Sequence, residues 1–128
     1  MLKFTKCFLM LIISFSVANG QRLNVVNYSQ SNGLPGNQIN DVIQDRHGLI
    51  WIATMSGVVT FDGKSFSNPD NCPELTNNPV KSIYQDSKGN LWFGSIRKGL
   101  FKYSGTKFTV YNTENGLSND IINVVNGD

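Results

Sequence analysis

The side chains that could do chemistry are few and lie apart in the sequence. Four carboxylates fall in expected loops, and hydrolysis of a glycosidic bond needs two carboxyl groups that face each other across that bond. These four residues show no paired spacing: Asp70, Glu74, Glu114 and Asp120. The scatter gives no support to a lyase or hydrolase site, so we expect no enzyme and no cofactor in this chain.

Two further candidates are single residues. A catalytic thiolate needs a histidine as its base, but the chain's one histidine, His47, lies in an expected turn well before Cys72. A kinase phosphoacceptor would lie on a helix, so His47 does not fit that role either, and no glycine-rich ATP-binding motif is present. Cys72 is the one cysteine outside the first 20 residues. An internal disulfide and a multi-cysteine metal site are therefore excluded for the remaining chain.

Two aspartates recur at the start of the same kind of turn. Residues 45–48 read Asp-Arg-His-Gly, and residues 86–89 read Asp-Ser-Lys-Gly. A carboxylate at the first position can cap such a turn, and glycine at the fourth accepts the left-handed conformation that closes it. The alternative is that Asp45 and Asp86 form a catalytic or calcium-binding pair. Their recurrence within one kind of turn favours the structural role.

These turns belong to a segment that the chain uses twice, at a spacing of 41 residues. Eight residues carry the motif: Asp45, Gly48, Trp51, Gly57, Asp86, Gly89, Trp92 and Gly99. A third copy begins, because residues 32–34 and 37–43 return as residues 115–117 and 119–125, but no third tryptophan follows. A fixed period rich in aromatic, β-branched and turn residues predicts one small sheet per repeat.

The inner strands of each repeat can be placed from their apolar residues. Residues 39–43 and the two matching runs have apolar side chains at helical spacing, but each run is too short for a stable helix, and we expect strands. Residues 49–54 and 91–95 are apolar at successive positions. Strands of that kind are buried on both faces, as in a stack of small sheets.

The outer part of each repeat is expected to be a hairpin. Strands after Gly57 and Gly99 lead to two-residue turns at residues 62–63 and 104–105, and outer strands follow. The connection over residues 67–78 is long, rich in proline and different from its counterpart. Loops of this kind carry function on repeat scaffolds. Each repeat is therefore interpreted as four antiparallel strands.

The two tryptophans of the motif have two interpretations. Trp51 and Trp92 could stack on a sugar ring, or they could wedge between neighbouring sheets. Their presence in both complete copies favours the wedge. Ala53 and Gly94, at matching positions two residues further on, are small and indicate crowding there.

The first 20 residues have the layout of a secretory signal peptide. Two lysines precede a mostly apolar run over residues 8–17, and small residues place the cleavage site between Gly20 and Gln21. An uncleaved membrane anchor is the alternative, but the apolar core of about ten residues is shorter than the roughly 20 that a span requires. We therefore expect an exported chain with no membrane span after signal removal.

The formal charge of the chain argues against one class of partner. The net charge is +2 at pH 7, and both lysines of the predicted signal contribute to it. The rest of the chain is balanced and carries no basic stripe, so we expect no binding to nucleic acid. A length of 128 residues fits one modest domain.

The order of these motifs resembles the two-component regulator propeller repeat. The resemblance rests on the Gly33-Leu34 lead, the Ile-x-x-Val run, the Gln-Asp-x-x-Gly-x-Ile/Leu-Trp core, and an aromatic residue before a glycine hairpin. It implies an all-β fold of β-propeller blades, here an incomplete propeller, because closed propellers have four to eight blades. Residues 21–128 would be this partial propeller, with repeat 1 at about 28–68, repeat 2 at about 69–110 and a truncated repeat 3 at about 111–128.

The family also implies a function. Its repeats form the periplasmic sensor region of hybrid two-component sensor histidine kinases in bacteria that degrade glycans. By this resemblance, the chain is an N-terminal fragment of a sensor that binds oligosaccharides and regulates polysaccharide utilisation by phosphorelay, in the periplasm of a Gram-negative bacterium. Its partners would be an oligosaccharide, the missing blades and the downstream kinase domains.

Several alternatives stay open at the level of sequence. The chain could be an exported propeller-type carbohydrate-active enzyme, or a structural or adhesive repeat protein. It could be a truncated gene product, or a short protein whose copies assemble into a ring. The resemblance identifies neither the ligand nor the residues that bind it.

Overall fold

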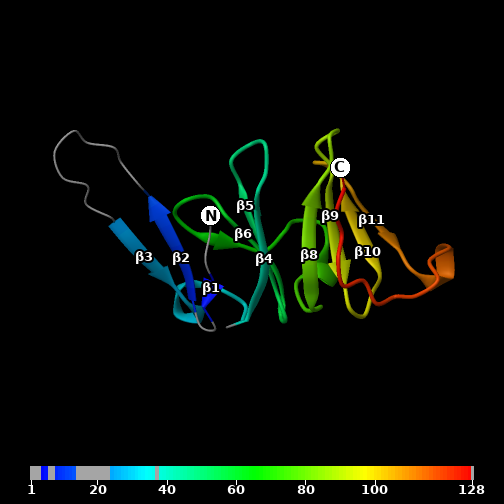
Figure 1. The fold of residues 1–128 in the computed structure, drawn as a ribbon, viewed down its shortest axis with the longest axis horizontal. Coiled ribbons are helices and arrows are strands. Elements are labelled where there is room, and N and C mark those ends of the chain that lie inside the picture. Colours follow the sequence, from blue (N-terminus) through cyan, green and yellow to red (C-terminus); the bar gives the residue numbers. More distant parts are fainter. Residues whose placement is uncertain (1–3, 6–7, 14–23, 37, 128) are drawn as a thin grey trace.

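The computed structural model describes residues 4–5, 8–13, 24–36 and 38–127, and their regular structure consists of β-strands and short 3-10 turns. Two four-stranded antiparallel sheets stand side by side, next to a smaller three-stranded sheet (Figure 1). The prediction of an all-β fold with four-stranded antiparallel repeats is confirmed. No helix in the described part of the chain is long and apolar enough to cross a membrane.

We call the two larger sheets blade 1 and blade 2, and in each of them the strands follow one another in sequence order. Blade 1 consists of β4 (Ile39–Gln44), β5 (Ile50–Thr54), β6 (Gly57–Phe61) and β7 (Phe66–Ser67). Blade 2 consists of β8 (Val80–Gln85), β9 (Leu91–Ser95), β10 (Leu100–Tyr103) and β11 (Phe108–Tyr111). The third sheet contains β1 (Phe4–Thr5), β2 (Phe8–Ile13) and β3 (Asn24–Tyr28). The 3-10 turns are η1 (Gln30–Asn32), η2 (Pro73–Leu75) and η3 (Thr113–Asn115).

The first strand of each blade is a strand, as expected, and not a helix. Both β4 and β8 contain a register shift near their second residue, which is the mark of a β-bulge. The bulge of β4 supplies the polar links to blade 2. The Asn40 side chain donates to the Val80 carbonyl at 2.7 Å, and the Asp41 carboxylate accepts from the Ile83 backbone amide at 2.8 Å. These bonds join the first strands of the two blades.

The expectation of two-residue hairpin turns is wrong. Four residues connect the third and fourth strands of each blade, over residues 62–65 and 104–107. The Asp62 carboxylate accepts backbone N–H groups from Lys64 at 2.8 Å and from Ser65 at 2.9 Å. An aspartate that bonds to the next backbone amides favours this longer turn, and the Asp-Gly pair lies within it.

The expectation of a strand in the third copy is also wrong. Residues 121–127 have no regular structure, although their sequence matches β4 and β8. A strand needs a neighbour for its ladder of hydrogen bonds, and this segment instead makes single bonds to blade 2. The Ile122 amide donates to the Ser95 carbonyl at 2.8 Å, and the Val125 amide donates to the Ser82 hydroxyl at 3.1 Å.

The central strand β5 is buried on both faces, because successive side chains of a strand point to opposite sides. The face toward blade 2 contributes to a core of residues from both blades: Trp51, Ala53, Val58, Cys72, Leu75, Val80, Ile83, Leu91, Phe93 and Phe101. The opposite face contributes Ile52 to a second cluster, which includes Phe61 and is covered by Tyr28 of β3. Each face of blade 1 is therefore covered by a neighbouring sheet.

The two motif tryptophans have different surroundings. Trp51 is only 3% exposed and lies between the blades, with ring centroids 5.5 Å from Phe93 and 5.3 Å from Tyr103. Trp92 is half-buried on the face of β9 that points away from blade 1. Its ring is partly covered by Lys102 and Tyr111 of its own blade.

Two glycines of the motif permit close backbone approach. Gly57 begins β6 and Gly99 precedes β10, with φ angles of 129° and 85°. A Cβ on Gly57 would collide with the carbonyl of Thr76, and one on Gly99 would collide with the carbonyl of Tyr111. Any larger side chain at these positions would push the following connection away from the blade.

β3 and η1 repeat the structure of β11 and η3. Each fourth-strand segment runs into a 3-10 turn whose last residue bonds reciprocally with the residue just before the turn, Asn32 with Ser29 in η1 and Asn115 with Asn112 in η3. The turns end at Gly33 and Gly116, with φ angles of 112° and 123°. β3 therefore corresponds to the fourth strand of a blade, and it is followed by blade 1 as β11 is followed by the start of the third copy.

The predicted signal peptide falls partly on described residues. Residues 8–13 form β2, which pairs antiparallel with β3. The predicted cleavage site, Gly20–Gln21, lies outside the described residues. Removal of the signal therefore stays a prediction.

We predict different losses of stability for alanine at the two tryptophans. Trp51→Ala would leave a cavity between two packed sheets and should lower the free energy of unfolding by about 3–5 kcal/mol. Trp92→Ala should cost only about 1–2 kcal/mol, because part of that ring already contacts water. Urea unfolding followed by circular dichroism measures both values. Equal losses would contradict the role of Trp51 as the wedge between the blades.

Candidate functional site

The aspartates of the two matching turns hold both the turn and the tryptophan. Oδ1 of Asp45 accepts the backbone N–H groups of His47 at 2.9 Å and Leu49 at 3.0 Å, while Oδ2 accepts the indole N–H of Trp51 at 2.9 Å. Gly48 takes the left-handed conformation at the fourth position, with φ 88°. The carboxylate of Asp45 is therefore fully occupied by groups of its own hairpin.

Asp86 has the same arrangement in blade 2. Its Oδ1 accepts from the amides of Lys88 and Asn90, and its Oδ2 accepts the Trp92 indole N–H at 2.9 Å and the Asn90 side-chain amide at 2.9 Å. Gly89 follows with φ 87°. The hydrogen bonds from Trp92 and then Asn90 lower the pKa of Asp86 to about 2.

The long connection over residues 67–78 packs into the core between the blades, which sequence analysis did not predict. Cys72 and Leu75 are buried there, and η2 holds them in place. Burial, with a smaller contribution from nearby Glu74, raises the pKa of the Cys72 thiol to about 11. Cys72 is therefore a small apolar core residue and not a nucleophile.

A pocket of about 140 Å³ opens between the blades, beside Trp51. Blade 1 and its connection form one side, and the other side comes from Tyr103 and Phe108 of blade 2. The blade 1 side consists of Leu49, Trp51, Thr60, Ser67, Asn68, Pro69 and Asp70. Three aromatic side chains and four polar residues line the pocket, and aromatic walls combined with polar groups occur at sites for small ligands.

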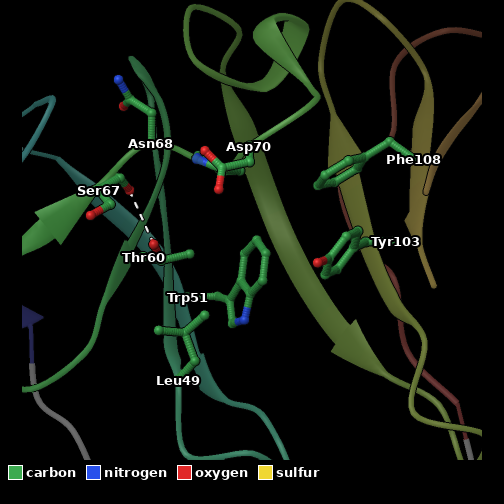
Figure 2. Close-up of a pocket in the computed structure, with 9 residues that line it drawn as sticks. Leu49, Trp51, Thr60, Ser67, Asn68, Asp70, Tyr103 and Phe108 are labelled. Carbon is green, nitrogen blue, oxygen red and sulfur yellow. Dashed lines mark hydrogen bonds between the residues drawn. The ribbon is translucent and has the colours of Figure 1, made fainter. Parts of the chain in front are cut away.

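The side chains around the pocket are arranged in two groups. Figure 2 shows the carboxylate of Asp70 on the same side as the Trp51 ring, with the rings of Tyr103 and Phe108 facing them. Tyr103 and Phe108 are stacked, with centroids 4.4 Å apart. The side chain of Asn68 points away from the rings in this view. Asp70 is therefore the charged group available to a ligand here.

The other loop carboxylates are not brought together with Asp70. Glu74 lies next to Cys72, 3.8 Å from its sulfur, and Glu114 is exposed at the start of η3. Asp120 accepts the backbone amide of Thr113 at 2.7 Å and so closes the η3 loop. No group of three or more potential metal ligands occurs among the residues that the structure describes.

The sequence predicts a loop position for the Asp70 carboxylate, but it does not predict the pocket beside it. Tyr103 and Phe108 were expected only as strand residues, and they come close to Asp70 because the blades pack face to face. The difference between the two repeats near residues 67–70 was the available signal. It marked the place where the copies diverge, and the pocket lies there.

The fold and comparisons with known proteins together define the class of this protein. Sheets of this kind, repeated side by side, are blades of a β-propeller. A family model described as "Two component regulator propeller" matches residues 33–56 and 74–97, once in each blade. The resemblance seen in the sequence is thus confirmed, and the chain contains two-component regulator propeller repeats.

A solved structure with a similar fold covers most of this chain. It is the extracellular domain of BT3049 from B. thetaiotaomicron, a protein assigned as a hybrid two component system. The TM-score is 0.64 at 22% sequence identity, and the match covers 87% of this chain. The chain spans 18% of the length of that structure's chain. No curated protein matches the sequence.

We predict that Asp86 makes stability depend on pH in acid. Its pKa falls from 3.8 to about 2 in the folded chain. Its stabilising contribution is therefore present above about pH 4 and is lost as the pH falls through about 2. Asp86→Asn should lower the urea midpoint at neutral pH, because an amide N–H₂ would face the Trp92 indole N–H. It should also reduce the loss of stability between neutral and acid pH.

Asp62→Asn is the matched control for Asp86→Asn. Asp62 uses a single oxygen, Oδ1, to accept both turn amides, and an asparagine supplies the same oxygen. The turn amides of Ser65 and Lys64 lower the pKa of Asp62, so the urea midpoint of Asp62→Asn at neutral pH should fall slightly, and by less than that of Asp86→Asn. An Asp86→Asn midpoint equal to the parent's would show that the bond to Trp92 contributes nothing.

We also predict that Cys72 is protected from alkylation. In a Cys7→Ser chain, iodoacetamide should react with folded Cys72 roughly 100-fold more slowly than with the urea-unfolded chain, because a rise of about two pKa units removes most of the thiolate. Mass spectrometry of timed samples measures both rates. Similar rates would contradict the packing of Cys72 between the blades.

Proposed function

We propose that this chain is part of the extracytoplasmic, ligand-sensing propeller of a hybrid histidine kinase receptor. The full receptor would bind oligosaccharides in the periplasm and control genes for polysaccharide utilisation. The two propeller repeats support the class of receptor, and so does the shared fold with an extracellular domain assigned to a hybrid two component system. The oligosaccharide ligand follows the family resemblance.

One observation carries the sensing role: the pocket draws residues from both blades. Trp51 and Asp70 come from blade 1 and its connection, and Tyr103 and Phe108 come from blade 2. A ligand that contacts both sides stabilises one packing of the blades over others. Binding energy can then be transmitted along the ring of sheets to the domains that follow.

We propose that this part of the receptor has no catalytic activity. Asp70 is the one carboxylate that lines the pocket, whereas glycoside hydrolysis needs two carboxyl groups at a defined separation. Glu74 and Asp120 are engaged elsewhere, with Cys72 and with Thr113. The arrangement fits recognition of a ligand better than turnover of one.

The test is calorimetric titration with oligosaccharides from digests of xylan, arabinan, pectin and starch. We expect saturable binding of at least one of them. Asp70→Ala should weaken that binding about tenfold, because it removes a charge-assisted hydrogen bond. Glu114→Ala is the control, since Glu114 is an exposed carboxylate outside the pocket. Absence of binding across the whole panel would contradict the proposal for this pocket.

A further inference from the structure

The surroundings of the two tryptophans differ in a way that bears on the ligand. In blade 2, Lys102 lies directly across from Trp92 in the neighbouring strand, and its Nζ is 5.2 Å from the centre of the Trp92 ring. In blade 1, the residue directly across from Trp51 is Thr60. Thr60 lines the pocket and carries no ammonium group, while Phe93 and Tyr103 of blade 2 cover the Trp51 ring.

At a second position, too, blade 1 carries a smaller side chain than blade 2. Tyr111 stacks on Trp92 in blade 2, with centroids 6.1 Å apart and planes at 25°. The hairpin loops before the fourth strands have equal length, so the counterpart of Tyr111 in blade 1 is Pro69. Pro69 lines the pocket together with Thr60. The two residues of blade 1 that correspond to Lys102 and Tyr111 therefore both line the pocket, and neither of them carries a charge or an aromatic ring.

The charge in the pocket lining is negative. Asp70 lines it, and none of the lining residues is a lysine or arginine. Within the described part of the chain, the Asp70 carboxylate makes no hydrogen bond or ion pair. The matching residue in blade 2 is the neutral Asn112, which caps η3. A carboxylate beside aromatic rings attracts a cation, because the ring faces are also negative.

We propose that the pocket binds a protonated amine carried on a six-membered ring. The ring would lie in the pocket beside Tyr103 and Phe108, and the ammonium would pair with the Asp70 carboxylate. The volume of about 140 Å³ suits one ring, since an engineered cavity of about 150 Å³ binds benzene. The inference rests on the proposed function in taking this pocket as the ligand site. An amino sugar and a simple cyclic amine share this chemistry.

The test uses amines and neutral molecules of the same shape as probes. Cyclohexylamine and glucosamine are compared with cyclohexanol and glucose at about pH 6, where the amines are protonated. The indole N–H signals of Trp51 and Trp92 are followed by two-dimensional NMR, and a Trp92→Phe chain assigns them. We expect the Trp51 signal to shift saturably with an amine, about tenfold more tightly than with its neutral match. The Trp92 signal should stay unchanged and serves as the internal control.

Two variants test the site itself. Thr60→Lys supplies the ammonium group that blade 2 already has, and it should abolish binding of the amines. Asp70→Asn should weaken amine binding about tenfold and weaken the binding of the neutral rings by a smaller factor. Glu114→Gln should behave like the parent chain. The NMR spectrum of each variant shows whether it is folded, and Asp70→Asn alone keeps the test decisive if Thr60→Lys does not fold.

The outcomes separate this inference from the proposed function. Equal affinity for amines and neutral rings, or an Asp70→Asn chain that binds amines as the parent does, overturns the amine site. If neutral oligosaccharides still bind at Trp51, the sensing role stands without it. If the amines bind and no oligosaccharide does, the amine site stands and the oligosaccharide ligand falls. If nothing binds, both proposals fail.

Discussion

The hydrogen bond from a tryptophan indole to the aspartate of its own turn is the constraint on which both blades depend. Each aspartate uses one carboxylate oxygen for the turn amides and the other for the indole N–H. In blade 1 this bond fixes the Trp51 ring between the two sheets, and in blade 2 it holds the half-buried Trp92 ring beside Lys102 and Tyr111. An indole N–H buried between sheets without a partner would cost about 1–3 kcal/mol. The carboxylate removes that cost and fixes the ring that spaces the sheets.

The packing between the blades combines this apolar wedge with polar links at both ends of the first strands. Asn40 and Asp41 bond to the backbone of β8 near its start, and the Arg46 guanidinium donates to the Ser87 carbonyl at 3.1 Å in the next turn. The links join residues about one repeat apart, so each repeat is positioned by the one before it. Because these hydrogen bonds and a buried ring fix the relative position of the sheets, a pocket at their edge has a defined shape. The ligand that we propose for this pocket would act on the same packing.

Much of the fold could be predicted from the sequence because its determinants are local. The four-stranded repeat follows from the turns at Asp45 and Asp86 and from the apolar strands after them. The pocket could not be predicted, since it depends on which side chains meet across two sheets. Cys72 is an example: its sequence neighbours indicate a loop, but η2 carries it into the core. The third copy is the opposite case, because its sequence matches a strand and it lacks the neighbour that a strand requires.

The two blades show two ways to cover the same surface. On blade 2, Lys102 and Tyr111 lie over Trp92, and Ile122 packs on Gly94 two residues further along β9. On blade 1, the next sheet covers Trp51, and smaller residues stand at the positions of the lysine and the tyrosine. A lysine at position 60 would have to share the space with Tyr103 and Phe108 of blade 2. The threonine and proline of blade 1 are therefore compatible with a neighbouring blade, and the room they leave at its edge is what makes a ligand site possible there.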